Sequence, residues 1–285
     1  MEDSDEELQQ PQPHGLLHFI HAHRELVDGE KDAVRLVHKT ELLENNANLN
    51  LAAYVADRAP LFYRSLESVI QDLRDGFFLT AMQSTLARMP TAESFRESHF
   101  GEIAAAIFAE EVLGLRKLYS KLSLLTAENS NAYKMDLLLY DPNKEPIEFV
   151  FGEVKSSPKH ESDGLPARHD KSCYADLFNS IRKYNSTDQS YDLAAARDNL
   201  SKLPQTEQQK VRAALLPYSG ATTAYAGFLV IDQSTFDLEE AQVLRTRRSK
   251  TELEIDLICV ESYSTTAAAV YEQLDSSGGP HQSAS

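Results

Sequence analysis

Three side chains in the middle of the chain have the types and spacing of a metal-dependent hydrolytic site. Asp136 lies at the start of an apolar stretch, K-M-D-L-L-L-Y-D, and Glu153 and Lys155 end another, E-F-V-F-G-E-V-K-S-S, which gives the spacing D-x16-E-x-K. Charges on buried strands need partners. Two neighbouring carboxylates repel, and a hard divalent cation keeps both ionised. The three residues therefore predict a metal centre in which Lys155 contacts a metal-bound water.

Strand geometry decides whether these side chains can meet. Side chains alternate across a strand, so Glu153 and Lys155 share one face and Val154 points to the other. Asp136 joins them if its strand pairs with theirs. The same residues also fit a simple ion pair between Glu153 and Lys155 at a strand end, since an acid-x-Lys triplet arises by chance roughly once in a chain of this length.

The elements around these residues alternate between helix and strand from Glu93 to Tyr263. Ser94 can cap a helix that ends at Gly114, with apolar positions recurring at three and four residues. Strands are expected over residues 115–125, 134–140, 147–155, 222–232 and 253–262, and helices over 172–184, 192–216 and 238–248. The predicted order is α, three β, α, β, α, β, which indicates an α/β protein.

This pattern resembles the PD-(D/E)xK nuclease superfamily, whose restriction-endonuclease-like fold has an αβββαβ core. The resemblance covers roughly Glu93 to Ser262. It implies that Asp136 and Glu153 bind Mg²⁺, with Mn²⁺ as an alternative ion, and that the Val154 carbonyl adds a ligand. It also implies that Lys155 activates the attacking water and that Glu102, on the first helix, completes the catalytic and metal site.

Three segments are more specifically similar to HamA, the nuclease subunit of the bacterial Hachiman anti-phage system: F-R-E-S-H-F-G-E-I-A, K-M-D-L-L-L-Y-D and F-G-E-V-K-S-S. That resemblance implies cleavage of DNA, restrained until a helicase subunit, HamB, engages its target. Met135 replaces the proline that usually precedes the aspartate. RecB-like members carry a glutamine four residues before a tyrosine, whereas here Ser180 precedes Tyr184.

Candidate nucleic-acid contacts follow the E-x-K strand. Lys159 and His160 lie in the loop after it, and Arg182 and Lys183 end the next helix. Basic side chains there could hold phosphates, although a solvated loop and a core-facing helix explain the same residues. His99, just before the Gly101-Glu102 pair, could face the same cleft.

The remaining chain divides into four parts. Residues 1–13 form an acidic leader and residues 264–285 a tail, and we expect the leader and the end of the tail to be disordered. Residues 14–92 read as a mainly helical N-terminal accessory region that includes a short hairpin, and residues 93–263 as the nuclease core. No apolar run is long enough to span a bilayer, and only two cysteines are present, so we expect a cytoplasmic protein; the family resemblance implies that it is bacterial.

The net charge of −16 is unusual for a DNA-binding protein. It fits a nuclease subunit that a partner delivers to DNA, because long-range attraction to phosphate is weak. Two alternatives stay open: a non-catalytic interaction protein of the same fold, and a metal-dependent RNase.

Overall fold

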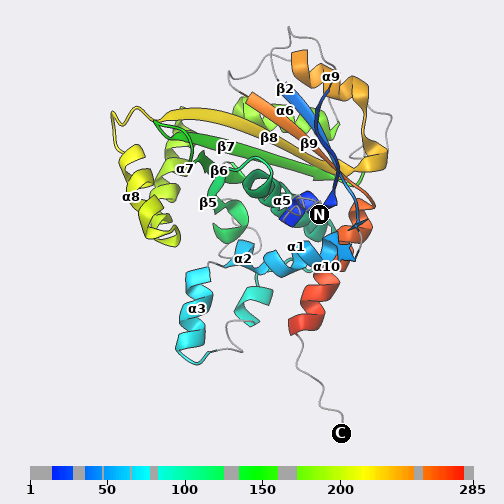
Figure 1. Ribbon diagram of the computed structural model, residues 1–285, viewed down its shortest axis with the longest axis horizontal. Coiled ribbons are helices and arrows are strands. Elements are labelled where there is room, and N and C mark those ends of the chain that lie inside the picture. The colour runs from blue at the N-terminus through cyan, green and yellow to red at the C-terminus, as the bar shows by residue number, and fades with distance from the viewer. Residues whose placement is uncertain are drawn as a thin grey trace, which may run out of the picture.

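The computed structural model describes residues 15–27, 36–46, 48–64, 66–77, 83–124, 135–159, 172–246 and 253–278. A seven-stranded mixed sheet runs through the molecule, with helices on both faces (Figure 1). Its strands are β1 (Ile20–Leu26), β2 (Leu36–Leu42), β5 (Arg116–Ser120), β6 (Leu137–Asp141), β7 (Glu148–Ser157), β8 (Thr222–Asp232) and β9 (Leu253–Val260). Two-residue strands, β3 (Asn45–Asn46) and β4 (Leu49–Asn50), form a separate pair.

The helices connect and cover these strands. They are α1 (Leu51–Arg58), α2 (Pro60–Tyr63), α3 (Leu66–Arg74), α5 (Glu93–Glu111), α6 (Cys173–Lys183), α7 (Ser186–Asp198), α8 (Gln205–Ala214), α9 (Leu238–Thr246) and α10 (Tyr263–Gly278). The described residues also include four 3-10 turns, and residues 83–86 are helical: η1 (Gly15–Phe19), η2 (Lys121–Leu124), η3 (Leu200–Lys202) and η4 (Gln233–Thr235) are the 3-10 turns.

The sheet order is β1-β2-β9-β8-β7-β6-β5. Strands β5, β6 and β7 form an antiparallel meander, whereas β7, β8, β9 and β2 run parallel. From α5 onward, the element order follows the predicted α, three β, α, β, α, β. Two details differ: the strand expected over 115–125 ends at Ser120 and continues as η2, and the helix expected over 192–216 is two helices, with Pro204 at the N-cap position of the second.

Helix α5 is the central helix of one layer. Its Ala-rich sequence favours helix, and its alanines allow close packing on nearly all sides: Ala105, Ala106 and Ala109 are fully buried. It packs against β7 and β8 on one side and against η1 and α10 on another. Gly114, at φ +69°, follows the helix in the left-handed conformation that suits glycine.

Helices α6 and α9 cover the other face of the sheet (Figure 1). Strand β7 is therefore buried on both faces, with Val150 and Val154 toward α5 and with Phe149 and Phe151 toward the helices that follow α6. A strand covered on both faces reads as a near-continuous apolar run. Glu153 and Lys155 are therefore exceptions, because they place charged side chains on a strand that is covered on both faces.

The N-terminal segment is less separate and less helical than predicted. The expected hairpin exists as the antiparallel pair β1–β2, but β2 also pairs with β9 over seven consecutive residues, from Leu36 opposite Glu254 to Leu42 opposite Val260. Strands β1 and β2 thus extend the same sheet as the predicted core. Helices α1 to α3 match the expected helical cover. The leader of residues 1–13 lies outside the described residues.

The prediction of a tail from residue 264 needs a second correction. Residues 263–278 form α10, which packs on α1 and α5. Its buried positions, Ala267, Val270, Tyr271 and Leu274, complete the core on this side of the sheet. Among the described residues, no helix combines the length and apolar composition that crossing a membrane requires.

Candidate active site

Asp136 lies where β6 begins and is turned toward β7. The register pairs Leu137 with Gly152, so Asp136 is the next position opposite Glu153. Its Oδ2 accepts a hydrogen bond of 2.9 Å from the backbone N–H of Val154. The carboxylate is buried. The strand pairing thus brings Asp136 to the Glu153–Lys155 segment, as the sequence predicted.

Glu153 and Lys155 face the layer formed by α6. Lys155 Nζ donates to Glu153 Oε1 at 2.6 Å, and Ser180 of α6 also hydrogen-bonds Glu153. Burial, and next the charge of Asp136, raise the pKa of Glu153 to about 7 even though Lys155 opposes the shift. Ser180, which stands where RecB-like proteins carry glutamine, is therefore part of the site.

Glu102 reaches the site from α5, on the opposite side of β7. Its Oε2 is buried and has no hydrogen-bond partner among the described residues. Burial first, and then the charge of Asp136, raise the pKa of Glu102 well above its usual value, while Lys121 and Lys155 act in the opposite direction. A buried carboxylate oxygen without a partner is costly, so a cation at this position would stabilise the ionised form.

Lys121 is a site residue that the sequence analysis missed. Its backbone N–H donates to the Asp136 carbonyl at 2.8 Å, and its Nζ lies 3.4 Å from Asp136 Oδ1. Burial acts to lower the pKa of Lys121, but the charges of Asp136 and Glu102 outweigh it and raise that pKa. No pattern within residues 115–125 indicated this: only the observed register of β5 on β6, with Ser120 opposite Leu137, places the next residue beside Asp136.

His99 lies near the site, and a contact with the hydroxyl of Tyr63 holds its ring in place. Its Nδ1 is 2.9 Å from the hydroxyl of Tyr63, which in turn contacts the hydroxyl of Tyr271 at 3.0 Å. Burial, followed by the nearby charge of Lys121, lowers the pKa of His99 to about 4. The imidazole is therefore neutral at physiological pH.

The candidate nucleic-acid contacts occupy two places. Lys159 is exposed just beyond the end of β7, and Arg182 and Lys183 are exposed on the last turn of α6, two and three residues after Ser180. His160 lies outside the described residues. Contact of these side chains with a nucleic acid stays a prediction.

The carboxylates of Glu102, Asp136 and Glu153 are the groups that could hold a metal. In the part of the chain that the structure describes, these three carboxylates do not converge into a preformed cluster of metal ligands. Instead, Asp136 and Glu153 each contact a lysine. The donor set still suits a hard cation, because it is all oxygen and Glu102 Oε2 lacks a partner.

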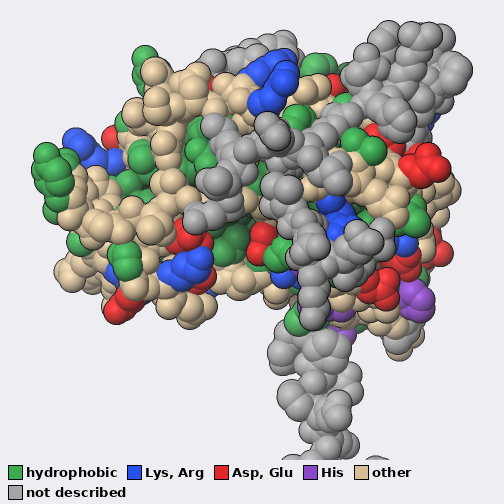
Figure 2. All heavy atoms as spheres, turned by 90° about the horizontal axis from the view of Figure 1, so that it is seen from above, with side chains coloured by type: hydrophobic (Ala, Val, Ile, Leu, Met, Phe, Trp, Pro, Cys, Tyr) green, Lys and Arg blue, Asp and Glu red, His purple; other side chains and the backbone are tan. Residues whose placement is uncertain are grey.

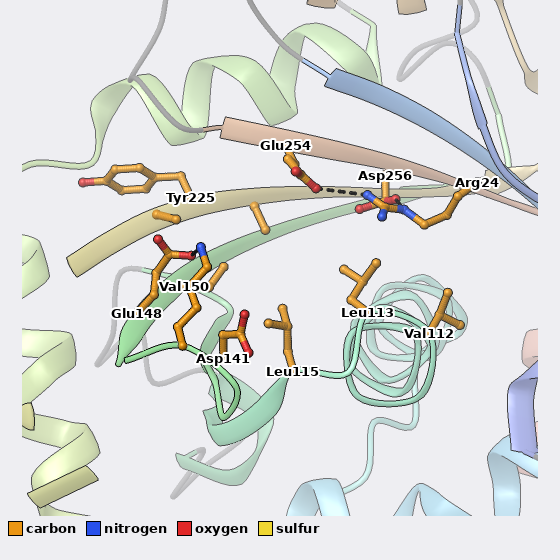
Figure 3. A pocket seen from close by; sticks show the side chains of 13 residues that line it. Arg24, Val112, Leu113, Leu115, Asp141, Glu148, Val150, Tyr225, Glu254 and Asp256 are labelled. Atoms are coloured by element: carbon orange, nitrogen blue, oxygen red, sulfur yellow. Dashed lines mark hydrogen bonds and ion pairs between the residues drawn. The ribbon is translucent and has the colours of Figure 1, made fainter. Parts of the chain in front are cut away.

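A separate pocket lies at the end of the sheet where β7, β8 and β9 begin, away from Glu153 and Lys155. This hollow of about 580 Å³ has an apolar wall from the end of α5 and a floor that includes Ala224 and Ala226. Figure 3 shows Arg24 extended toward Glu254 and Asp256 on β9. Acidic side chains outnumber basic ones in its lining, so it suits a phosphate backbone poorly.

The raised pKa of Asp256, which lines this pocket, should make the stability of the fold depend on pH. Arg24 Nε donates to its Oδ1 at 2.9 Å and Arg24 also contacts Glu254 and His38, yet burial raises the pKa of Asp256 to about 6. Between about pH 4 and pH 6 the folded chain keeps a proton that the unfolded chain has released, so raising the pH favours unfolding.

We therefore expect wild type to lose about 1–3 kcal/mol of unfolding free energy relative to Asp256→Asn between pH 4 and pH 6.5. Urea unfolding of both proteins across this range measures the difference. Parallel curves for the two proteins would contradict the assignment.

The family model described as HamA matches residues 15–274, a range that includes the sheet, α5 and all the candidate catalytic residues. No curated protein matches the chain.

Proposed function

Because the chain belongs to the HamA family, which implies a component of the Hachiman defence system, we propose that it is a metal-dependent nuclease that hydrolyses DNA phosphodiester bonds. The observation that supports this most is the hydrogen bond from Val154 N–H to Asp136, which brings the aspartate to Glu153 and Lys155. The order of elements from α5 to β9 is also compatible with a restriction-endonuclease-like core.

Each residue has a distinct part in the proposed reaction. Asp136 and Glu153, with the Val154 carbonyl and Glu102, would hold Mg²⁺ or Mn²⁺. When bound, such an ion would neutralise negative charge on the phosphate oxygens and lower the pKa of a water. Lys155 lies within hydrogen-bond distance of Glu153, which places its ammonium beside the proposed metal position. From there it would orient the attacking water or stabilise the developing negative charge. Ser180 fixes the Glu153 carboxylate from α6.

The surface charge supports delivery to DNA by a partner. The chain carries a net charge of −16, and on the face seen in Figure 2 the described Lys and Arg side chains are interspersed with Asp and Glu rather than joined in one basic surface. Long-range attraction to phosphate is weak on such a surface. We infer that a helicase subunit of the HamB type brings the DNA, and that Lys159, Arg182 and Lys183 make only local contacts with it.

Incubation of the purified chain with circular and linear DNA tests this function. We expect cleavage with Mg²⁺ or Mn²⁺, none with EDTA, and faster cleavage when the helicase subunit and ATP are added. A parallel RNA substrate distinguishes a DNA nuclease from an RNase. Absence of cleavage under every condition, together with absence of metal binding by calorimetry, would favour a non-catalytic interaction protein, in which the two acid–lysine pairs are simply structural.

A further inference from the structure

We propose that Lys121 is the resident counter-cation of Asp136, and that a metal ion must displace its ammonium to bind the site. This inference rests on the proposed metal-dependent function and adds a second lysine to it. Lys121 follows β5 and belongs to neither of the two strands that carry Asp136, Glu153 and Lys155.

The two oxygens of Asp136 are used differently. Oδ2 accepts the backbone N–H of Val154 at 2.9 Å, an interaction that fixes the carboxylate against β7. Oδ1 faces Lys121 Nζ at 3.4 Å. Oδ2 already uses one of its lone pairs in the Val154 hydrogen bond, so Oδ1 is the oxygen with more free acceptor sites for a metal ion. Lys121 occupies the approach to this oxygen.

The contact between Lys121 and Asp136 is long enough for a metal ion to replace the ammonium. The pair between Lys155 and Glu153 is 2.6 Å long, whereas the pair between Lys121 and Asp136 is longer by 0.8 Å. The Lys121 side chain is partly exposed, so it can turn toward solvent. The backbone hydrogen bond from Lys121 to the Asp136 carbonyl does not depend on where the ammonium points. Displacing the ammonium therefore leaves β5 attached to β6.

The ammonium of Lys121 offsets part of the negative charge of the site, so it should weaken the affinity of the site for a divalent cation. Three carboxylates, those of Glu102, Asp136 and Glu153, face two ammonium groups, and Glu102 Oε2 has no hydrogen-bond partner among the described residues. The charge of Lys121 acts on Asp136 and Glu102 together. Removing it leaves three carboxylates with one ammonium, which increases the attraction of the site for a divalent cation.

Calorimetric titration with Mn²⁺ alone tests the proposal without relying on activity. We expect Lys121→Met to bind Mn²⁺ about tenfold more tightly than wild type, and Lys121→Arg to stay close to wild type because it keeps the cation. Lys117→Met is the matched control: it also removes one positive charge, four residues earlier in the chain, but Lys117 pairs with Glu110 and lies over the ring of Phe62. Its Mn²⁺ affinity should change less than about twofold.

Thermal unfolding in EDTA and in Mn²⁺ provides a second measurement. Lys121→Met should be less stable than wild type in EDTA, where Asp136 loses its partner, and should gain more from added Mn²⁺. Unchanged or weaker Mn²⁺ binding by folded Lys121→Met, beside a wild type that binds, would overturn this inference and leave the proposed nuclease site standing. Absence of Mn²⁺ binding by wild type and both Lys121 variants would overturn the site itself, and this inference with it.

Discussion

Glu153→Gln is expected to reduce metal-dependent DNA cleavage by at least about 10²–10³-fold while the protein stays folded. The carboxylate is proposed to bind the metal, and an amide has neither the charge nor the second oxygen. The fold should tolerate the change, because burial already disfavours the charged form and raises the pKa of Glu153 to about 7. Gln keeps the size of the side chain and can still accept from Lys155 and Ser180.

A matched variant on the same strand controls for a general effect of charge. Glu148→Gln makes the same substitution at the first residue of β7, in the separate pocket, where Glu148 contacts Lys144. Cleavage by this variant should stay within about twofold of wild type, and both variants should give circular dichroism spectra and melting curves of folded protein. Equal cleavage by Glu153→Gln and wild type would exclude Glu153 from the reaction.

The approach of Asp136 to Glu153 could be predicted because it follows from local rules. Consecutive strands joined by a short turn usually pair, and alternation then decides which side chains share a face. The structure has this pairing, with Leu137 opposite Gly152. The residue types and spacing indicated a metal-dependent hydrolytic role for these residues, the family resemblance made it a nuclease, and that role remains a proposal.

Lys121 could not be predicted because the sequence analysis continued a strand through it. The alternating apolar residues of 115–125 look uniform, but only residues up to Ser120 pair with β6. The chain then turns into η2, and that turn directs Lys121 to Asp136. The end of a strand depends on its partner strand, which a pattern within one segment does not contain.

Helix α10 had a usable signal that was overlooked. Ala267, Val270, Tyr271 and Leu274 are spaced as one face of a helix, and all four are buried. The small and polar residues around them suggested a tail instead. The joining of β2 to β9 is a different case, since a parallel pair between residues more than 200 positions apart leaves no local pattern.

Gly101→Ala is expected to destabilise the fold and to disturb the site through the packing of α5 on β7. A Cβ at residue 101 would stand 2.3 Å from Ser156 Cβ, 2.6 Å from Ser156 Oγ and 3.0 Å from the hydroxyl of Tyr263. The helix must therefore move away from the strand, and Glu102 moves with it. We expect a loss of about 1–3 kcal/mol of stability, and up to about a hundredfold slower cleavage if Glu102 shifts by about 1 Å.

The double variant Gly101→Ala with Ser156→Gly isolates this contact. Removing Cβ and Oγ from residue 156 makes room for the new methyl group, so the double variant should be more stable than the sum of the two single effects predicts. Denaturant unfolding of all four proteins measures the coupling, and Mn²⁺ titration shows whether the site recovers with it. Purely additive effects would mean that α5 does not rest on Ser156, and that Glu102 is positioned by some other contact.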